Sequence, residues 1–283
     1  AGAQLAFKAE HLQRGGAFKF RGACNAVWSL DADRAIAGVV THSSGNHGAA
    51  LALAARTRGI PCHVVVPEGA VAAKLANIAR HGATLWRCPP TIADREATCA
   101  RVQADTGATL VHPYTDPAVM AGQGTAALEL LHSDGPFDVL VVPVGGGGLA
   151  SGTALALQHA SPQTRLVLAE PAGADDTARS LAAGERQGAF APDTICDGLR
   201  TLIGAPNFEL LRAAGAEVIV VDDTATMAAM RLLWEGLRQV VEPSSATVLA
   251  AVLAQPQRFA GLRVGLVLSG GNVDLPALRW GAP

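Results

Sequence analysis

Residues 38–66 read GVVTHSSGNHGAALALAARTRGIPCHVVV, and this stretch decides the fold. The short apolar run at 38–41 predicts a strand, and the alanine-rich run at 47–58 predicts a helix that Gly59 ends. The run at 62–66 predicts a second strand. Two strands joined through a helix pair in parallel, so the stretch predicts one β-α-β unit of a parallel sheet.

The same alternation of short apolar runs and longer alanine-rich runs continues along the chain. Further strands are expected at 83–86, 109–111, 139–142, 165–168, 217–221 and 263–268, and further helices at 71–81, 92–106, 119–131, 150–159, 225–240 and 245–253. Residues 173–208 are rich in glycine, proline and aspartate and are expected to be irregular. This alternation predicts an α/β fold with mostly parallel sheets flanked by helices.

Composition excludes several classes of protein. Of the 283 residues, 49% are hydrophobic and 16% are charged, which excludes a disordered chain. The net charge of −2 and the lack of a basic block argue against a nucleic-acid partner. Every apolar run is interrupted before it reaches the length of a membrane span. The five cysteines are odd in number and lack CxxC spacing, which favours free thiols in a reducing cytosol and hence a cytoplasmic protein.

A lysine between two aromatic residues is the first chemical signal. Lys19 lies between Phe18 and Phe20, so its amine is expected to be partly desolvated, and desolvation favours the neutral amine that forms a Schiff base. The glycine run at 145–148 follows an apolar strand and opens a helix, where backbone N–H groups can hold a phosphate. A carbonyl cofactor with a phosphate, such as pyridoxal phosphate, would use both features. By itself, the glycine run is equally compatible with a tight turn without a ligand.

Other polar residues at strand ends have two readings each. The hydroxyl of Ser269, after the last strand, can bond a ring nitrogen or cap a turn. Asn46 and His47 begin a helix and can bind a ligand or cap that helix. Glu170 and the Asp175-Asp176 pair can bind a hard cation or form a solvated turn.

Taken together, the motifs resemble the fold-type II pyridoxal-phosphate enzymes, nearest to the serine/threonine dehydratases and serine racemases, including hydroxyaspartate dehydratases. The matching segments are 18–23, 43–48, 122–125, 145–149, 242–244 and 269–274. The resemblance implies a two-lobed fold like that of tryptophan synthase β. A large cofactor-binding lobe would combine residues 1–37 with 116–283, and residues 38–115 would form a small mobile lobe. It also implies a homodimer.

The resemblance also implies roles for individual residues. Lys19 forms the Schiff base and takes the Cα proton, and Ser44 is the second acid/base in the racemases. The implied cofactor contacts are Phe18, Lys19, Asn46, Gly145, Gly146, Gly147, Gly148, Leu149, Gly198 and Ser269. The implied substrate contacts are Ser43, Ser44, Asn46, His47, Arg95 and Thr201. A divalent cation (Mg²⁺, Mn²⁺ or Ca²⁺) would be held by Glu170, the Ala174 carbonyl and Asp176.

The expected activity is therefore a lyase reaction. A small L-β-hydroxy amino acid (serine, threonine or 3-hydroxyaspartate) would be converted to a 2-oxo acid and ammonia. The alternatives are a serine or aspartate-type racemase with the same cofactor, a sulfhydrylase or cystathionine synthase, and a non-enzymatic binding protein. Arg95 can pair with a second substrate carboxylate, which favours hydroxyaspartate, or with its neighbours Asp94 and Glu96 at the surface.

Some positions depart from the family pattern. Ala49 stands where the animal racemases have a glutamine near a nucleotide site, so activation by ATP is not expected. Ala17 replaces a common serine, and Tyr114 replaces a common asparagine. The family has about one more strand and helix before the position of Leu5.

Overall fold

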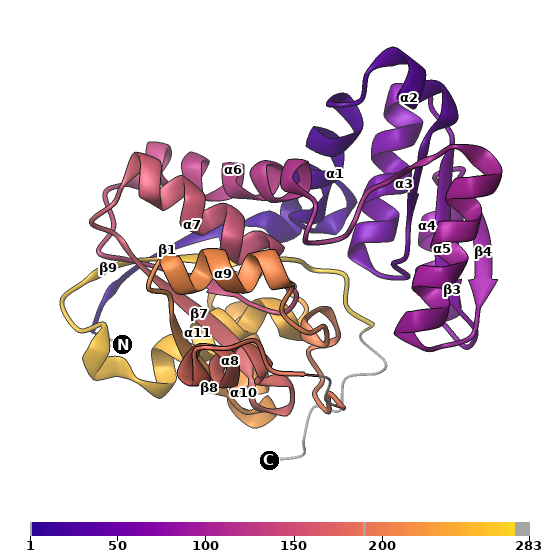
Figure 1. Ribbon diagram of the computed structural model, residues 1–283. Coiled ribbons are helices and arrows are strands. Elements are labelled where there is room, and N and C mark those ends of the chain that lie inside the picture. Colours follow the sequence, from indigo (N-terminus) through magenta and orange to yellow (C-terminus); the bar gives the residue numbers. More distant parts are fainter. Residues whose placement is uncertain (1, 189–190, 275–283) are drawn as a thin grey trace. The chain divides into compact units, whose positions relative to one another are not determined.

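The computed structural model describes residues 2–188 and 191–274. It divides the chain into two compact units, called here the large unit (Ala1–Phe18 with Gly124–Pro283) and the small unit (Lys19–Gln123). Figure 1 labels the elements of both. Each unit contains one sheet whose strands are all parallel, which confirms the predicted α/β fold with helix-flanked parallel sheets.

The small unit is built on a four-stranded sheet with the order β4-β3-β2-β5. Its strands are β2 (Val39–Thr41), β3 (Cys62–Pro67), β4 (Thr84–Cys88) and β5 (Thr109–Leu110), and its helices are α1 (Lys19–Trp28), α2 (Ala32–Ala37), α3 (Asn46–Arg58), α4 (Ala72–Ala79) and α5 (Ile92–Thr106). Helices α1, α3 and α4 share one apolar core with the sheet, while α5 packs on a second core around Val40 and Val65. Helix α6 (Pro117–Asp134) begins in this unit and ends in the large one.

The large unit is built on a five-stranded sheet with the order β1-β9-β6-β7-β8. Its strands are β1 (Gln4–Ala9), β6 (Val139–Pro143), β7 (Arg165–Pro171), β8 (Glu217–Val221) and β9 (Arg263–Leu268). Its helices are α7 (Gly148–Ala160), α8 (Asp176–Ala183), α9 (Ala205–Ala213), α10 (Asp223–Leu237) and α11 (Pro243–Ala254), with short 3-10 turns at Glu10–Leu12, Arg14–Gly16, Ala172–Ala174, Asp197–Leu199 and Pro256–Arg258.

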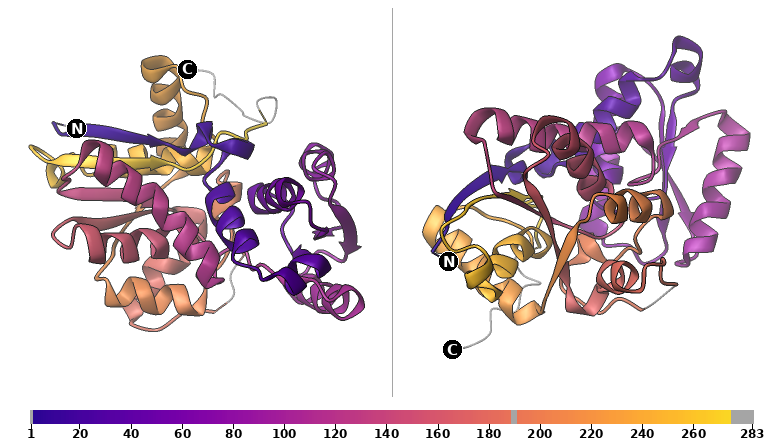
Figure 2. Two further views of the ribbon diagram at one scale, coloured as in Figure 1. Left: turned by 90° about the horizontal axis from the view of Figure 1, so that it is seen from above. Right: turned by 60° about the vertical axis from the view of Figure 1, so that its left-hand side comes forward.

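Alternate residues of β6 face two different cores of the large unit. Val139 and Val141 pack with α10 and α11, while Leu140 and Val142 pack with α7 and α9. Figure 2 shows these helix layers from two further directions. Because successive side chains of a strand point to opposite faces, a strand buried on both sides needs apolar residues throughout, which is why VLVVP has no polar position.

The sequence-based expectation for residues 173–208 was wrong. This segment contains α8 and the start of α9 rather than an irregular loop. The first turn of α8 is capped from β7, since the carboxylate of Glu170 accepts the N–H groups of Thr177 and Ala178. A cap supplied by a distant residue leaves no local signal, so helix-boundary rules cannot find it.

Two other elements were not predicted, namely β1 and α1. The strand β1 pairs with β9 at the far end of the chain, with Gln4 beside Arg263. The helix α1 packs through Phe20 and Ala23 on the small unit's core, so the compact unit reaches back to Lys19. The predicted mobile lobe, residues 38–115, stays a prediction, and the end of the predicted large lobe, 275–283, lies outside the described residues.

None of the helices in the described part of the chain is long and apolar enough to cross a membrane. All five cysteines are free.

Candidate functional site

Lys19 begins helix α1 of the small unit. Its neighbour Phe20 is buried, and Lys19 itself is half-buried. Its Nζ donates a hydrogen bond to the carbonyl of Pro113, at 3.0 Å. Helix α1 is held tightly against α6, because a Cβ at Gly122 would lie 2.6 Å from the Cα of Gly22. The lysine therefore starts from a rigid helix rather than from a flexible loop.

The loop between β2 and α3 brings a set of polar groups to the start of a helix. Ser43, Ser44 and Asn46 are half-buried, and Gly45 is the N-cap residue without a side-chain cap. A Cβ at Gly48 would lie 2.0 Å from the carbonyl oxygen of Ser43, so only glycine allows this loop to fold back on the helix. Uncapped N–H groups at a helix N-terminus attract an anion, as a substrate carboxylate requires.

His47 lies in the first turn of α3 and is 2% exposed. Its Nε2 is 3.2 Å from the carbonyl of Val111 and therefore carries the proton, which leaves Nδ1 unprotonated. Nδ1 is buried and has no hydrogen-bond partner in the described structure. Burial, together with the charge of Lys19, holds the pKa of His47 well below 6.5, so the ring is neutral at pH 7.

Arg95 lies in the first turn of α5 and is half-buried. Its Nη2 donates to the carbonyl of Pro90 at 3.3 Å, and its buried Nε has no partner among the described residues. Within that part of the chain, no ion pair joins Arg95 to Asp94 or Glu96. Its charge instead contributes to the environment of His42, next to Ser43, whose pKa is lowered mainly by burial.

In the large unit, the glycine loop (residues 145–148) joins β6 to α7 and is buried throughout. Gly147 has φ of +92° and is the N-cap of α7, with no side-chain cap. A Cβ at Gly147 would lie 2.5 Å from the side chain of Ile203, and one at Gly145 would lie 2.9 Å from Leu199. The loop is thus a close-fitting cradle in front of an uncapped helix start, as a bound phosphate needs.

The end of β9 is tied to the segment that leads to Lys19. The carbonyl of Ser269 accepts the N–H of Phe18 at 3.0 Å, and Ala17 forms a β-bridge with Gly270. Ser269 is 3% exposed. The peptide bond from Phe18 to Lys19 therefore connects the predicted ring-nitrogen partner and the predicted Schiff-base lysine through a single residue.

Gly198 and Thr201 lie in the segment after α8. Both are exposed, and the N–H of Gly198 donates to Ser244 Oγ at 3.1 Å. Ser244 follows the buried Glu242 at the start of α11.

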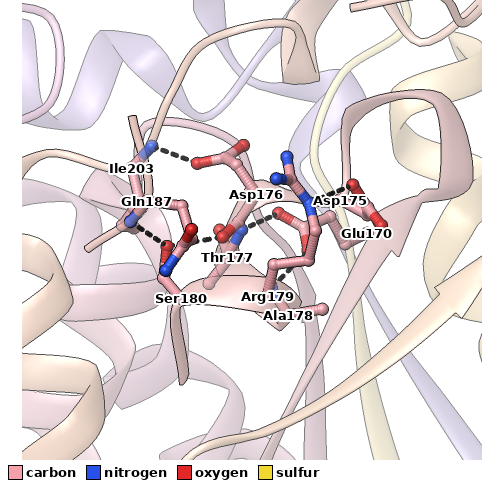
Figure 3. A network of polar contacts seen from close by, with 9 residues as sticks. All are labelled: Glu170, Asp175, Asp176, Thr177, Ala178, Arg179, Ser180, Gln187 and Ile203. Carbon is pink, nitrogen blue, oxygen red and sulfur yellow. Dashed lines mark hydrogen bonds and ion pairs between the residues drawn. The ribbon is translucent and has the colours of Figure 1, made fainter. Parts of the chain in front are cut away.

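Two buried carboxylates form the third predicted group. Glu170 at the end of β7 and Asp176 at the start of α8 are both 0% exposed. Figure 3 shows both carboxylates bonded to backbone N–H groups: Glu170 to residues of α8, and Asp176 Oδ2 to Ile203 at 2.7 Å. Asp176 Oδ1 is buried without a partner in the described residues. Burial raises the pKa of Glu170 to about 8 and also raises that of Asp176.

The comparisons with known proteins bear on this arrangement directly. The family described as pyridoxal-phosphate-dependent enzyme matches residues 1–270. This chain belongs to that family. A β-hydroxyaspartate dehydratase of Paracoccus denitrificans (strain Pd 1222) is 48% identical to this pyridoxal-phosphate enzyme over 279 residues, which are 99% of this chain and 89% of the relative.

Solved structures of the family resemble the enzyme equally well. Maize serine racemase is 45% identical, with a TM-score of 0.95 over 97% of this chain and 85% of that chain. A bacterial threonine deaminase, from T.th., is 41% identical, with a TM-score of 0.91 over 97% of this chain and 89% of that chain. The enzyme is therefore similar in sequence and fold to dehydratases and racemases, as the resemblance implied.

The residues present fit the cofactor of this family. The buried glycine loop leaves no room for side chains and presents uncapped N–H groups, which suits the phosphate. The amine of Lys19 starts a rigid helix, which suits a carbonyl carbon. The individual contacts assigned from the sequence stay predictions.

For the cation, the fit is with oxygen donors only. No group of three or more His, Cys, Asp or Glu side chains that could hold a metal ion occurs at positions 2–188 and 191–274. Two buried carboxylates plus a carbonyl, with Asp176 Oδ1 unpartnered, is the donor set that a hard cation takes when water completes its shell.

Sequence reasoning overlooked two features of this site. One is the contact of Lys19 with Pro113, and the other is the contact of Asp176 with Ile203. The His112-Pro113 pair and the Asp175-Asp176 pair were noticed, but neither pattern indicates its distant partner.

Proposed function

We propose that this enzyme removes water from 3-hydroxyaspartate and releases a 2-oxo acid and ammonia. The observation that carries the proposal is Arg95, whose half-buried guanidinium has an unpartnered Nε and no ion pair among the described residues. A guanidinium binds a carboxylate best through two parallel hydrogen bonds, and hydroxyaspartate has a second carboxylate where serine and threonine have none. The relative named β-hydroxyaspartate dehydratase supports the same substrate.

The cofactor and the chain divide the chemistry between them. Pyridoxal phosphate, when bound, supplies an electron sink for negative charge at Cα. We assign to Lys19 the attachment of the cofactor and the removal of the Cα proton at Nζ. The N–H groups of Gly145 to Leu149 hold the phosphate, Phe18 and Gly198 flank the ring, Asn46 bonds the ring hydroxyl, and Ser269 bonds the ring nitrogen.

The start of α3 is proposed to bind the α-carboxylate of the substrate. Ser43, Ser44 and Asn46 supply polar groups, and the helix dipole supplies positive potential. The neutral His47 adds an acceptor without adding charge. Thr201 is assigned to the substrate side of the large unit. Residues 38–115 are proposed to move as one lobe.

A racemase is the second candidate, because Ser44 offers a half-buried hydroxyl as a second acid/base group. The likeness to maize serine racemase supports it. Chiral analysis of serine and aspartate after incubation measures this activity directly: formation of the other enantiomer supports a racemase, and its absence excludes one.

Three further assignments belong to the proposal. A divalent cation (Mg²⁺, Mn²⁺ or Ca²⁺) binds at Glu170, the Ala174 carbonyl and Asp176, as the unpartnered Asp176 Oδ1 supports. The enzyme acts in the cytoplasm, as five free cysteines support. It forms a homodimer, as family likeness suggests, and light scattering of the purified protein would measure a mass near twice 28.9 kDa.

The test is 2-oxo acid release from purified enzyme with added pyridoxal phosphate and Mg²⁺. The substrates are L-serine, L-threonine, L-threo-3-hydroxyaspartate and their D-enantiomers. We expect the highest kcat/KM for hydroxyaspartate. Arg95→Ala should raise KM for hydroxyaspartate about 10- to 100-fold, since a hydrogen bond to a charged group contributes about 1.5–3 kcal/mol, and should leave serine turnover unchanged.

Arg101→Ala is the matched control, because Arg101 lies on the same helix and is exposed. If Arg95→Ala and Arg101→Ala have the same KM for hydroxyaspartate, Arg95 has no part in substrate choice. Release from serine or threonine alone would overturn the proposed substrate.

A further inference from the structure

The loop that follows β5 is organised by the ring of His112. Its Nδ1 accepts hydrogen bonds from the backbone N–H groups of Tyr114, at 3.4 Å, and Thr115, at 3.2 Å. An imidazole nitrogen that accepts from two amides is unprotonated, so the ring's proton lies on Nε2. The side chain of His112 thus closes the turn of which it is the first residue.

The ring of His112 is held between two other rings. His42 packs edge-on against it with centroids 5.1 Å apart, and Tyr114 does so at 4.6 Å. The contact with His42 follows from the sheet, because β2 and β5 are neighbours with Val40 beside Leu110, and both histidines come two residues later. Burial, with smaller effects from His42 and Lys19, lowers the pKa of His112 to about 4. The ring therefore remains a neutral acceptor at pH 7.

The turn presents one carbonyl to the amine of Lys19. Pro113 lies between His112 and Tyr114 and is buried, and its carbonyl accepts from Lys19 Nζ at 3.0 Å. Proline has a fixed φ and no N–H group, so its carbonyl direction is set once the following turn is closed. The two bonds to His112 Nδ1 close that turn. The position of the acceptor for Lys19 is thus determined by the ring of the residue that precedes it.

We propose that His112 is a positioning residue for Lys19, acting through the carbonyl of Pro113. This carbonyl retains Nζ at one place whenever the amine is not bonded to another group, so that the amine meets an incoming carbonyl carbon from a fixed direction. The reaction role rests on the proposed function, because an amine that holds a cofactor and moves a proton has to return to the same place in each turnover. The contact itself does not depend on that function.

Two measurements on the full chain test the proposal. The first uses protein stripped of cofactor: Lys19 is methylated with formaldehyde and cyanoborohydride, and the labelled peptide is quantified by mass spectrometry across a range of pH. The second follows the absorbance change when pyridoxal phosphate is added back. Only the second requires that the chain bind the cofactor, so a failure of the proposed function leaves the first measurement valid.

Three variants separate positioning from folding. His112→Phe keeps the ring packing on His42 and loses the acceptor, whereas His112→Asn retains an acceptor oxygen. His132→Phe is the control, because His132 is an exposed histidine in the last turn of α6. We expect His112→Phe to slow cofactor loading about tenfold, the factor that loss of one net hydrogen bond gives, and to alter the pH profile of Lys19 methylation. His112→Asn should recover most of the rate.

Wild-type loading and an unchanged methylation profile in folded His112→Phe would overturn the proposal. If that variant fails to fold by circular dichroism, Thr115→Pro tests the same link, because it removes one N–H donor to Nδ1 and leaves the ring in place. Folded Thr115→Pro with wild-type methylation of Lys19 would equally overturn it.

Discussion

Asp176 and Ile203 are joined by a buried hydrogen bond, with 2.7 Å between the carboxylate Oδ2 and the backbone nitrogen. The next residue, Gly204, donates its N–H to the carbonyl of Gly146 at 3.1 Å. The side chain of Ile203 lies against Gly147. The carboxylate loop and the glycine loop are therefore linked through two consecutive residues, and a change at one should be measurable at the other.

Removal of this carboxylate should loosen the glycine loop. Asp176→Ala leaves the buried N–H of Ile203 without a partner, which costs about 1–3 kcal/mol. We expect a loss of that size in the free energy of unfolding, measured in urea, together with weaker binding of pyridoxal phosphate, measured by fluorescence. Asp175→Ala is the matched control, since Asp175 forms only a partly exposed pair with Arg179. Equal cofactor affinity in the two variants would contradict the link.

A cation at the carboxylate loop should stabilise the folded enzyme. Mg²⁺ or Ca²⁺ at about 100 times its dissociation constant adds about 2.7 kcal/mol to the stability of a protein that binds it only when folded. We expect the melting temperature to fall on addition of a chelator and to recover with excess cation. The Asp176→Ala variant should show no chelator effect. An unchanged melting temperature in the wild type would remove the cation assignment.

Gly147 should tolerate no side chain. Its φ of +92° is strained for any other residue, and a Cβ there would meet Ile203 at 2.5 Å. Gly184→Ala is the matched control, because Gly184 has φ of +74° and open space around the missing Cβ. Both variants should lose about 1–2 kcal/mol of stability from backbone strain. Gly147→Ala should lose about 1–3 kcal/mol more, from overpacking, and should bind the cofactor poorly. Equal losses in the two would show that the cradle is not close-fitting.

Mild acid should destabilise the small unit through its buried histidines. The pKa of His112 is lowered from 6.5 to about 4, by burial first and then by His42 and Lys19. As pH falls below 6.5, the unfolded chain takes up the proton first, so this stability is full above pH 6.5, declines between 6.5 and 4, and is lost below 4. Arg95, Glu96 and the nearby His47 also act on this cluster.

The measurement for the histidine prediction is urea unfolding at several pH values for wild type and His112→Phe. The difference between the two curves isolates the contribution of His112. We expect the variant's stability to depend less on pH between 6.5 and 4. Parallel curves over this range would mean that His112 is protonated equally in the folded and unfolded chain.

Much of the fold was readable from local patterns. The predicted helix at 92–106 and the predicted strands at 217–221 and 263–268 have the same bounds in the structure. These elements have clear local signals, such as the N-cap Thr91 and the left-handed C-cap Gly107 for α5. The elements that were missed lack such signals, as the distant cap of α8 illustrates.

The candidate site divides in the same way. The glycine loop, the start of α3 and Lys19 are continuous in sequence, so each was found as a motif and each lies at the start of a helix in the structure. The acceptor of Lys19 and the link from Asp176 to Ile203 join residues far apart in the chain. No pattern in either partner marks the other.

The sequence alone determined that strands and helices alternate, that three polar loops precede helices, and that a lysine lies between two aromatic rings. Periodicity and capping act over a few residues, so neighbours in the chain suffice to specify them. Only the tertiary structure decided that β1 pairs with β9, that His42 packs on His112, and that Ile203 bonds Asp176. These contacts depend on strand order and on close packing of the core, which the whole chain determines together.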